Sequence, residues 1–237
     1  MLSINPNRPR LLSRGSRRLI FIPILMILIL SAKCACAYSL PKLFNFNIKN
    51  ALDEWQEKVF KNRVLYLAQP EQKGGHLLAK SKKACSGLIY KIKFDPQKYP
   101  MLSWKWKVIE FPNKNIGKNM KGGWLEQDDY AARVYIIFPS WLFMNIKCIE
   151  YVWDENLPKG KILTSPYFEN IKLIVAESGK QNADQWVMEE HNIYEDYKQA
   201  FGKKPGYVGA IALMTDSDNT LSTAEALYTD IKVGYKK

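Results

Sequence analysis

Two acidic segments carry the side chains best suited to chemistry in this sequence. The segment MTDSDNT contains Asp216, Asp218 and Asn219, and an earlier segment contains Asp128 and Asp129. Such side chains can bind a hard cation, contact a ligand directly, or bond their own backbone in a turn. The D-x-D-N spacing resembles a fragment of a calcium loop, although the glycine and final glutamate of an EF-hand are missing. A calcium site, a ligand contact and a simple turn therefore all stay open.

Arg133 follows the earlier acidic segment closely and supplies a cation. Both acidic segments lie at the ends of apolar runs, so we expect them to meet at one edge of the fold. Two carboxylates about 4 Å apart repel by roughly 4 kcal/mol at an effective dielectric near 20, so a cation or a proton must compensate them. A guanidinium can bind a carboxylate through two parallel hydrogen bonds. The sequence predicts a polar cluster organised by Arg133, with calcium as the alternative.

Signatures of common catalytic sites are missing from the sequence. It holds two histidines, His76 and His191, and no metalloprotease motif, nucleophile elbow or phosphate-binding glycine loop. Zinc enzymes, serine hydrolases and nucleotide-binding proteins are therefore disfavoured. His191 adjoins two glutamates and is expected to be hydrogen bonded or solvated. A glycosidase or polysaccharide lyase that uses Asp129 and Asp218 is the enzymatic alternative.

Tryptophans are the second set of candidate binding residues. Trp104 and Trp106 share one face of an alternating apolar pattern, which predicts core positions. Trp124 and Trp141 lie at the ends of expected strands, where an aromatic ring could contact a sugar. Trp124 is grouped with the acidic residues and Arg133 as a candidate ligand site.

Residues 1–37 have the order of a secretory signal peptide. Five arginines precede an apolar run at 19–30, and Ala35-Cys36-Ala37 offers a cleavage site after Ala37. The run is too short for a comfortable membrane span, so no stable span is expected after cleavage. We expect one domain at 38–237 in the periplasm or secreted. Cleavage removes six basic and no acidic residues, which lowers the net charge from +12 to about +6 and leaves no basic face typical of nucleic-acid binding.

Two cysteines, Cys85 and Cys148, belong to the expected mature chain. In an oxidising compartment they could close a loop of about 64 residues, worth roughly 4 kcal/mol in the chain-entropy model. The alternative is a pair of buried thiols that do not meet.

Short apolar runs separated by turn signals predict an all-β fold. We expect a two-sheet antiparallel β-sandwich of jelly-roll or galactose-binding-like type. Apolar side chains on both faces of 131–138 predict a central strand. Asn192, Glu195 and Gly202 predict a short helix at 193–201, and residues 52–61 could form another helix or an irregular lead. The expected strands are 64–68, 76–80, 88–94, 102–111, 130–138, 147–153, 171–177, 186–193, 207–214 and 224–233.

Several motifs occur in a familiar order along the chain. These are WKWKV, DDYAARVYIIF, YVW, QWVMEEHNIYEDYKQAFG, IALMTDSDNT and ALYTDIKV. Over residues 55–235 their succession resembles an uncharacterised family of exported bacterial proteins, the domain-of-unknown-function family DUF3047. The resemblance implies a β-sandwich, export and no established activity. An arginine is expected where this chain has His191, so the resemblance assigns no role to that position.

Together these features favour a non-enzymatic exported β-sandwich that binds a carbohydrate or another cell-envelope component. The alternatives are the carboxylate-dependent enzyme and a structural envelope protein stabilised by calcium. The sandwich class and the lack of catalytic spacing favour the binding protein.

Overall fold

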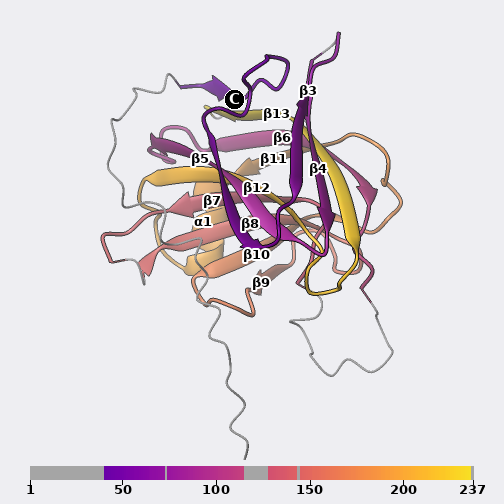
Figure 1. The fold of residues 1–237 in the computed structure, drawn as a ribbon. Helices are drawn as coiled ribbons and strands as arrows, with labels where there is room; N and C mark the ends of the chain where they lie inside the picture. The colour runs from indigo at the N-terminus through magenta and orange to yellow at the C-terminus, as the bar shows by residue number, and fades with distance from the viewer. Residues whose placement is uncertain (1–39, 73, 115–127, 143–144, 236–237) are drawn as a thin grey trace, which may run out of the picture.

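Two β-sheets packed face to face form the body of the protein (Figure 1). The computed structural model describes residues 40–72, 74–114, 128–142 and 145–235. Sheet A has the order β11-β6-β13-β4-β3, with β1 also paired to β13. Its strands are β1 (Lys42–Leu43), β3 (Leu65–Gln69), β4 (His76–Lys82), β6 (Met101–Glu110), β11 (Val187–Asn192) and β13 (Thr223–Gly234).

Sheet B has the order β2-β5-β12-β7-β8-β10-β9. Its pairs are antiparallel except for β8 and β10, which run parallel. The predicted two-sheet sandwich is confirmed. The strands of this sheet are β2 (Trp55–Lys61), β5 (Cys85–Phe94), β7 (Arg133–Phe138), β8 (Lys147–Asp154), β9 (Ile162–Thr164), β10 (Ile171–Ser178) and β12 (Val208–Asp216).

Aromatic side chains from both sheets fill the space between them. Trp104 and Trp106 of β6 are fully buried, as their alternation predicts. The ring of Trp104 lies 5.2 Å from that of Tyr151, and Trp106 lies 5.8 Å from Trp153, both from β8. These contacts join the two sheets through large apolar surfaces, which dominate the stability of such a core.

Strand β7 is central in sheet B, as the apolar character of both its faces predicts. Every residue of β7 is buried. Val134 and Ile136 belong to the core between the sheets, whereas Tyr135 and Ile137 belong to a second apolar cluster on the other face of sheet B. This placement gives the sheet two apolar faces.

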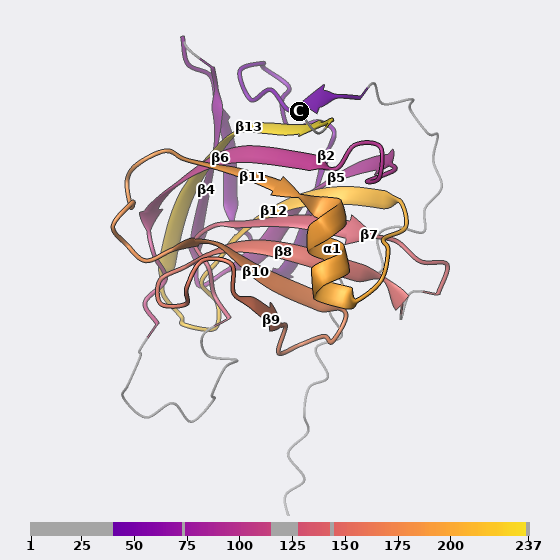
Figure 2. The same ribbon diagram turned by 180° about the vertical axis from the view of Figure 1, so that it is seen from behind.

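Helix α1 (Ile193–Phe201) covers one end of the sandwich (Figure 2). The side chain of Asn192 caps it by accepting a hydrogen bond from the Glu195 N–H, and Gly202 ends it in a left-handed conformation with φ 68°. Ile193 and Tyr197 are its buried residues. The predicted helix is confirmed. Within the described residues, no helix has the length and apolar content needed to cross a bilayer.

Two expectations from the sequence are corrected by the structure. Residues 55–61 form β2 rather than a helix or an irregular lead, because they pair with β5 and bury Trp55. Cys85 and Cys148 are free thiols, so of the two alternatives left open by the sequence the disulfide is wrong and the pair of separate thiols holds. They lie on β5 and β8, three strands apart, or about 14 Å at a strand spacing near 4.8 Å. A disulfide needs Cα atoms within about 7 Å.

Candidate functional site

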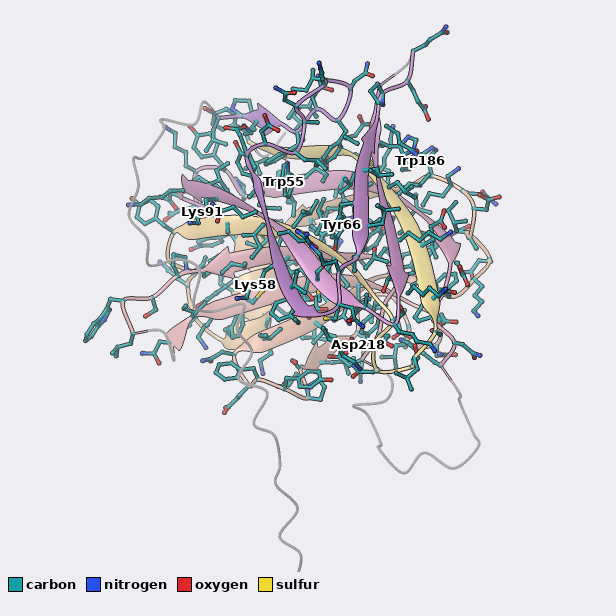
Figure 3. The ribbon with its side chains drawn as sticks, viewed as in Figure 1. Trp55, Lys58, Tyr66, Lys91, Trp186 and Asp218 are labelled. Carbon is teal, nitrogen blue, oxygen red and sulfur yellow. The ribbon has the colours of Figure 1, made fainter. Side chains whose placement is uncertain are left out.

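The acidic segments and Arg133 meet at one end of sheet B. Strands β7 and β12 are neighbours, and Arg133 lies opposite Met214 in their register. Asp216 is two residues beyond Met214, so its side chain emerges on the same face and diagonally beside Arg133. Figure 3 places nearby Asp218 at the end of the molecule that lies away from Lys91. The juxtaposition predicted from the sequence is therefore present.

Arg133 is the hub of this end. Its Nε and Nη2 donate to the two Asp216 carboxylate oxygens at 2.9 and 2.5 Å, and its Nη1 donates to Glu150 Oε1 at 2.5 Å. Nη2 also donates to the Asp128 main-chain carbonyl. Burial opposes the charge on Arg133, but Asp216, Tyr135, Glu150 and Asp128 outweigh it and raise its pKa above the ordinary value. Arg133 thus stays charged and neutralises buried carboxylates.

Asp129 fastens the acidic turn after β12 to the segment before β7. It is fully buried, and its two carboxylate oxygens accept hydrogen bonds from the N–H groups of Asn219 and Thr220 at 3.2 and 2.6 Å. Asn219 exchanges side-chain hydrogen bonds with the Tyr167 hydroxyl. Asp218 lies 3.6 Å from the ammonium of Lys61. These contacts make MTDSDNT a turn held in a hydrogen-bonded network that is rich in carboxylates. We call it the Arg133 cluster: Asp128, Asp129, Arg133, Glu150, Asp216, Asp218 and Asn219.

This donor set does not fit the calcium site considered from the sequence. Cys85 Sγ and carboxylate oxygens of Asp216 and Asp218 lie within 4.8 Å of one another. Calcium, however, takes six to eight oxygen ligands and has no use for a thiol. Both Asp216 oxygens already accept hydrogen bonds from Arg133, and the amide of Asn219 is bonded to Tyr167.

The residues at this end of the sheet also do not fit the carboxylate-dependent enzyme considered as an alternative. A glycosidase carboxylate must reach the glycosidic bond or an attacking water. Asp129 is buried and spends both oxygens on main-chain N–H groups, so it is a poor partner for Asp218 in such a reaction. Trp124, which we grouped with this site, lies outside the described residues.

Glu150 was missed because it lies inside an apolar strand. The sequence shows only a single glutamate within the apolar run CIEYVW. Its charge is compensated by Arg133 of the neighbouring antiparallel strand β7, a contact that the local sequence does not indicate. Tyr167 was missed as well, because nothing in the local sequence indicates that its loop reaches Asn219.

His191 is packed among aromatic rings beside two carboxylates. Its ring stacks on Trp104 at 5.3 Å, and its Nδ1 lies 3.2 Å from Asp196. The expected hydrogen bond is therefore present. Burial opposes protonation of His191, but hydrogen bonds and charge from Asp196 and Glu189 outweigh it and raise the pKa of the imidazole. The ring is packed against Trp104 and Tyr151 and bonded to Asp196, an arrangement that supports packing rather than chemistry.

A pocket of about 420 Å³ lies at the other end of sheet B, beside α1. Phe138 and Tyr197 supply its aromatic lining, with ring centroids 4.6 Å apart. Trp141 and Tyr207 each directly follow a residue that lines the pocket, and their exposed fractions are 87% and 57%. We call it the lysine pocket, and its lining residues are Phe138, Pro139, Ser140, Asn145, Lys147, Tyr197, Lys203, Lys204 and Gly206.

The sequence predicts turns for the residues around this pocket. The segment FGKKPG ends α1, and its adjacent lysines were the available signal. Trp141 was noted as a strand-end tryptophan that could contact a ligand, and the structure shows that its side chain is exposed.

Comparisons with known proteins define the family of the chain. A family model described as "Protein of unknown function (DUF3047)" matches residues 53–232, and no curated protein matches. One similar solved structure is the family 11 carbohydrate-binding module of a cellulosomal cellulase from Clostridium thermocellum. Its TM-score is 0.45 at 10% identity, covering 84% of this chain and 97% of the module.

Two further structures are similar at the same level. They are a family 30 carbohydrate-binding module from Clostridium thermocellum (TM-score 0.42, 8% identity, 78% of this chain and 92% of the module) and the xyloglucanase domain of NopAA from Sinorhizobium fredii (TM-score 0.39, 9% identity, 77% and 91%). At such identities and TM-scores, what these proteins bind or cleave does not transfer to this chain.

Proposed function

The chain belongs to the DUF3047 family of proteins of unknown function, and we propose that it is a non-catalytic, exported β-sandwich that binds carbohydrate of the cell envelope. The lysine pocket and the exposed rings of Trp141 and Tyr207 are the ligand-binding surface. The N-terminal segment of residues 1–37 directs the chain to the periplasm or the exterior.

The observation that carries the proposal is the combination of a pocket with two exposed aromatic residues, each adjacent in sequence to a residue that lines it. An indole that is 87% exposed leaves a large apolar surface in water, which is unfavourable unless a partner covers it. Sugar rings present apolar C–H faces to aromatic rings and hydroxyl groups to polar side chains. The pocket offers the hydroxyl of Ser140 and the amide of Asn145 for the second purpose.

The Arg133 cluster has a structural role in this proposal. Most of its charged groups are buried and already hydrogen bonded within the protein, so few of their hydrogen-bonding positions are left for a ligand. Replacing its members would change stability before it changed binding.

Binding to a panel of soluble envelope polysaccharides and oligosaccharides tests the proposal. We expect Trp141→Ala and Tyr207→Ala each to weaken binding roughly fivefold, since loss of an aromatic contact costs on the order of 1 kcal/mol. Trp186→Ala is the matched control, because Trp186 is also exposed but its ring lies beside His76 and Lys107 of sheet A, whereas the pocket lies at the end of sheet B. Absence of binding to every carbohydrate, or equal effects of all three variants, would refute it.

A further inference from the structure

The lysine pocket gathers positive charge without matching negative charge. Lys147, Lys203 and Lys204 all line it. No carboxylate in the described part of the chain lies within ion-pair distance of any of the three. Other exposed lysines, such as Lys82 and Lys83, also have no such partner there. What distinguishes these three is that they line one pocket together.

The charge of Lys147 is partly desolvated and opposed by its neighbours. Its ammonium donates to the Asn170 amide oxygen at 2.9 Å and lies 4.4 Å from the centre of the Phe201 ring. Burial lowers the pKa of Lys147, and Lys203 and Lys172 lower it further, whereas Glu169 opposes them by raising it. An anion in the pocket would relieve this repulsion.

Neutral groups around the three ammonium groups suit an oxyanion. Ser140 and Asn145 line the pocket and can donate hydrogen bonds, and buried Phe138 and Tyr197 supply aromatic surface to it. Lys93 adds a fourth positive charge near the border, 5.4 Å from the centre of the Tyr207 ring. Charged donors backed by fixed walls are the usual construction of an anion subsite.

The opposite end of sheet B carries the reverse charge. Arg133 and Phe138 are the two ends of β7, and the buried carboxylates surround the first while the lysine pocket adjoins the second. The field of the molecule therefore directs an anionic ligand toward the pocket.

We infer that the lysine pocket is an anion-binding subsite that recognises the acidic group, a carboxylate or a phosphate, of an acidic glycan. This inference extends the proposed function and rests on it for the claim that the ligand is a carbohydrate. The three lysines bind the oxyanion, and the exposed rings of Trp141 and Tyr207 contact the sugar that carries it.

Calorimetric titration of the mature chain tests this inference with three probes. They are trigalacturonate, a neutral trisaccharide of galactose, and inorganic phosphate, each at about 50 mM and about 500 mM NaCl. We expect trigalacturonate to bind and the neutral sugar to bind at least tenfold more weakly. High salt should weaken trigalacturonate binding severalfold, because added ions screen the lysines.

Two double variants localise the effect. We expect Lys203→Gln with Lys204→Gln to weaken trigalacturonate binding at least tenfold. Lys82→Gln with Lys83→Gln is the matched control: it removes the same charge from an adjacent exposed lysine pair at the end of the sandwich near Ser217, and it should change binding less than twofold. Unfolding midpoints of both variants should match that of the parent chain.

The outcomes separate this inference from the proposed function. Equal binding of acidic and neutral sugars, or equal effects of the two double variants, overturns the anion subsite and leaves carbohydrate binding standing. Binding of phosphate that depends on Lys203 and Lys204, with no binding of either sugar or of the polysaccharide panel, supports the anion subsite and overturns the carbohydrate proposal. No binding of any of the three probes overturns the anion subsite, and the polysaccharide panel then decides the carbohydrate proposal.

Discussion

Arg133 is one guanidinium among several buried carboxylates. It contacts Asp216 and Glu150 directly, and its Nη1 lies 3.8 Å from Asp128 Oδ1. Its Cζ also lies 4.6 Å from the centre of the Tyr130 ring. Breaking a buried ion pair by removing one partner leaves the other charge desolvated and uncompensated. A single substitution of Arg133 should therefore lower the stability of the protein by leaving several buried carboxylates without a cation.

We predict that Arg133→Met lowers the free energy of unfolding by about 3–5 kcal/mol, because its carboxylate partners lose their cation in a dry site. Arg63→Met is the control. Arg63 pairs with Glu57, but its side chain is 75% exposed, so this variant should lose less than about 1 kcal/mol. Urea unfolding at neutral pH measures both. Similar losses in the two variants would contradict a structural role for the Arg133 cluster.

Asp128 makes the stability of the protein depend on pH. Its Oδ1 is buried without a hydrogen-bond partner in the described structure. Burial raises the pKa of Asp128 to about 7, with help from Glu150 and Asp129 and against the effect of Arg133 and Lys114. Since this folded-state pKa lies above the ordinary 3.8, the folded chain holds the proton longer than the unfolded chain. The resulting stabilisation is full below about pH 3.8 and is lost as the pH rises through about 7.

We predict that Asp128→Asn, which cannot ionise, gains stability relative to the parent chain as the pH rises from about 4 to about 7. The gain should level off above that range, because the parent carboxylate is then charged in both states. Chemical unfolding of both proteins across this range gives the difference directly, and shared titrations of other groups cancel. A difference that does not change with pH would show that Asp128 titrates normally.

At the scale of elements, what the sequence predicts depends on how local the determining interaction is. The caps of α1 are set by Asn192 and Gly202 within the helix itself, so the helix was predicted to the residue. The alternation of β6 reports burial directly, so Trp104 and Trp106 were placed correctly. Strand β2 was not, because its partner β5 fixes its conformation and its own alternation is weak.

The same distinction holds for the two ends of sheet B. Acidic residues and Arg133 at strand ends were enough to predict the Arg133 cluster, because opposite charges buried at one edge must meet. Glu150 depended on a neighbouring strand, and the lysine pocket depended on how the turn after β7 and the segment after α1 come together. Those contacts join segments that are distant in the sequence, and they produce no periodic pattern of residue types from which they could be predicted.

Gly209 shows how closely these elements pack beside the lysine pocket. It lies in β12 where the pairing with β5 shifts register. A Cβ atom at this position would lie 2.7 and 2.8 Å from Cγ and Cδ of Pro139, the residue that follows β7. A proline ring cannot rotate away, so Ser140 and Trp141 would move with it.

We predict that Gly209→Ala lowers the free energy of unfolding by about 1–3 kcal/mol, as overpacking does, and weakens ligand binding at the lysine pocket. Gly206→Ala is the control from the same pocket, because a Cβ there meets no heavy atom within 4 Å. It should stay within about 0.5 kcal/mol of the parent chain. Unfolding curves and ligand titrations of both variants measure the two effects. Equal behaviour would mean that Pro139 does not hold this segment.

At the scale of the whole molecule, the sandwich begins soon after the expected signal peptide. Strand β1 starts at Lys42 and pairs with β13, where Lys42 lies opposite Val233. Cleavage after Ala37 would leave four residues before this strand and would spare both sheets. The mature chain would then keep the Arg133 cluster and the lysine pocket, at opposite ends of one sheet, in the compartment where an envelope glycan is found.

We predict that the chain, expressed with its first 37 residues in a bacterial host, is recovered outside the cytoplasm with Tyr38 as its N-terminal residue. Intact mass and N-terminal sequencing of the extracytoplasmic fraction measure this directly. Ala37→Arg should block processing and leave the full-length chain with the membranes, because small residues are needed before the cleaved bond. Ala51→Arg, a partly buried position outside that motif, is the control for a general effect of added charge. A parent chain that keeps residues 1–37 and stays with the membranes would show that this segment is an anchor, and the ligand would then have to be sought at the membrane surface.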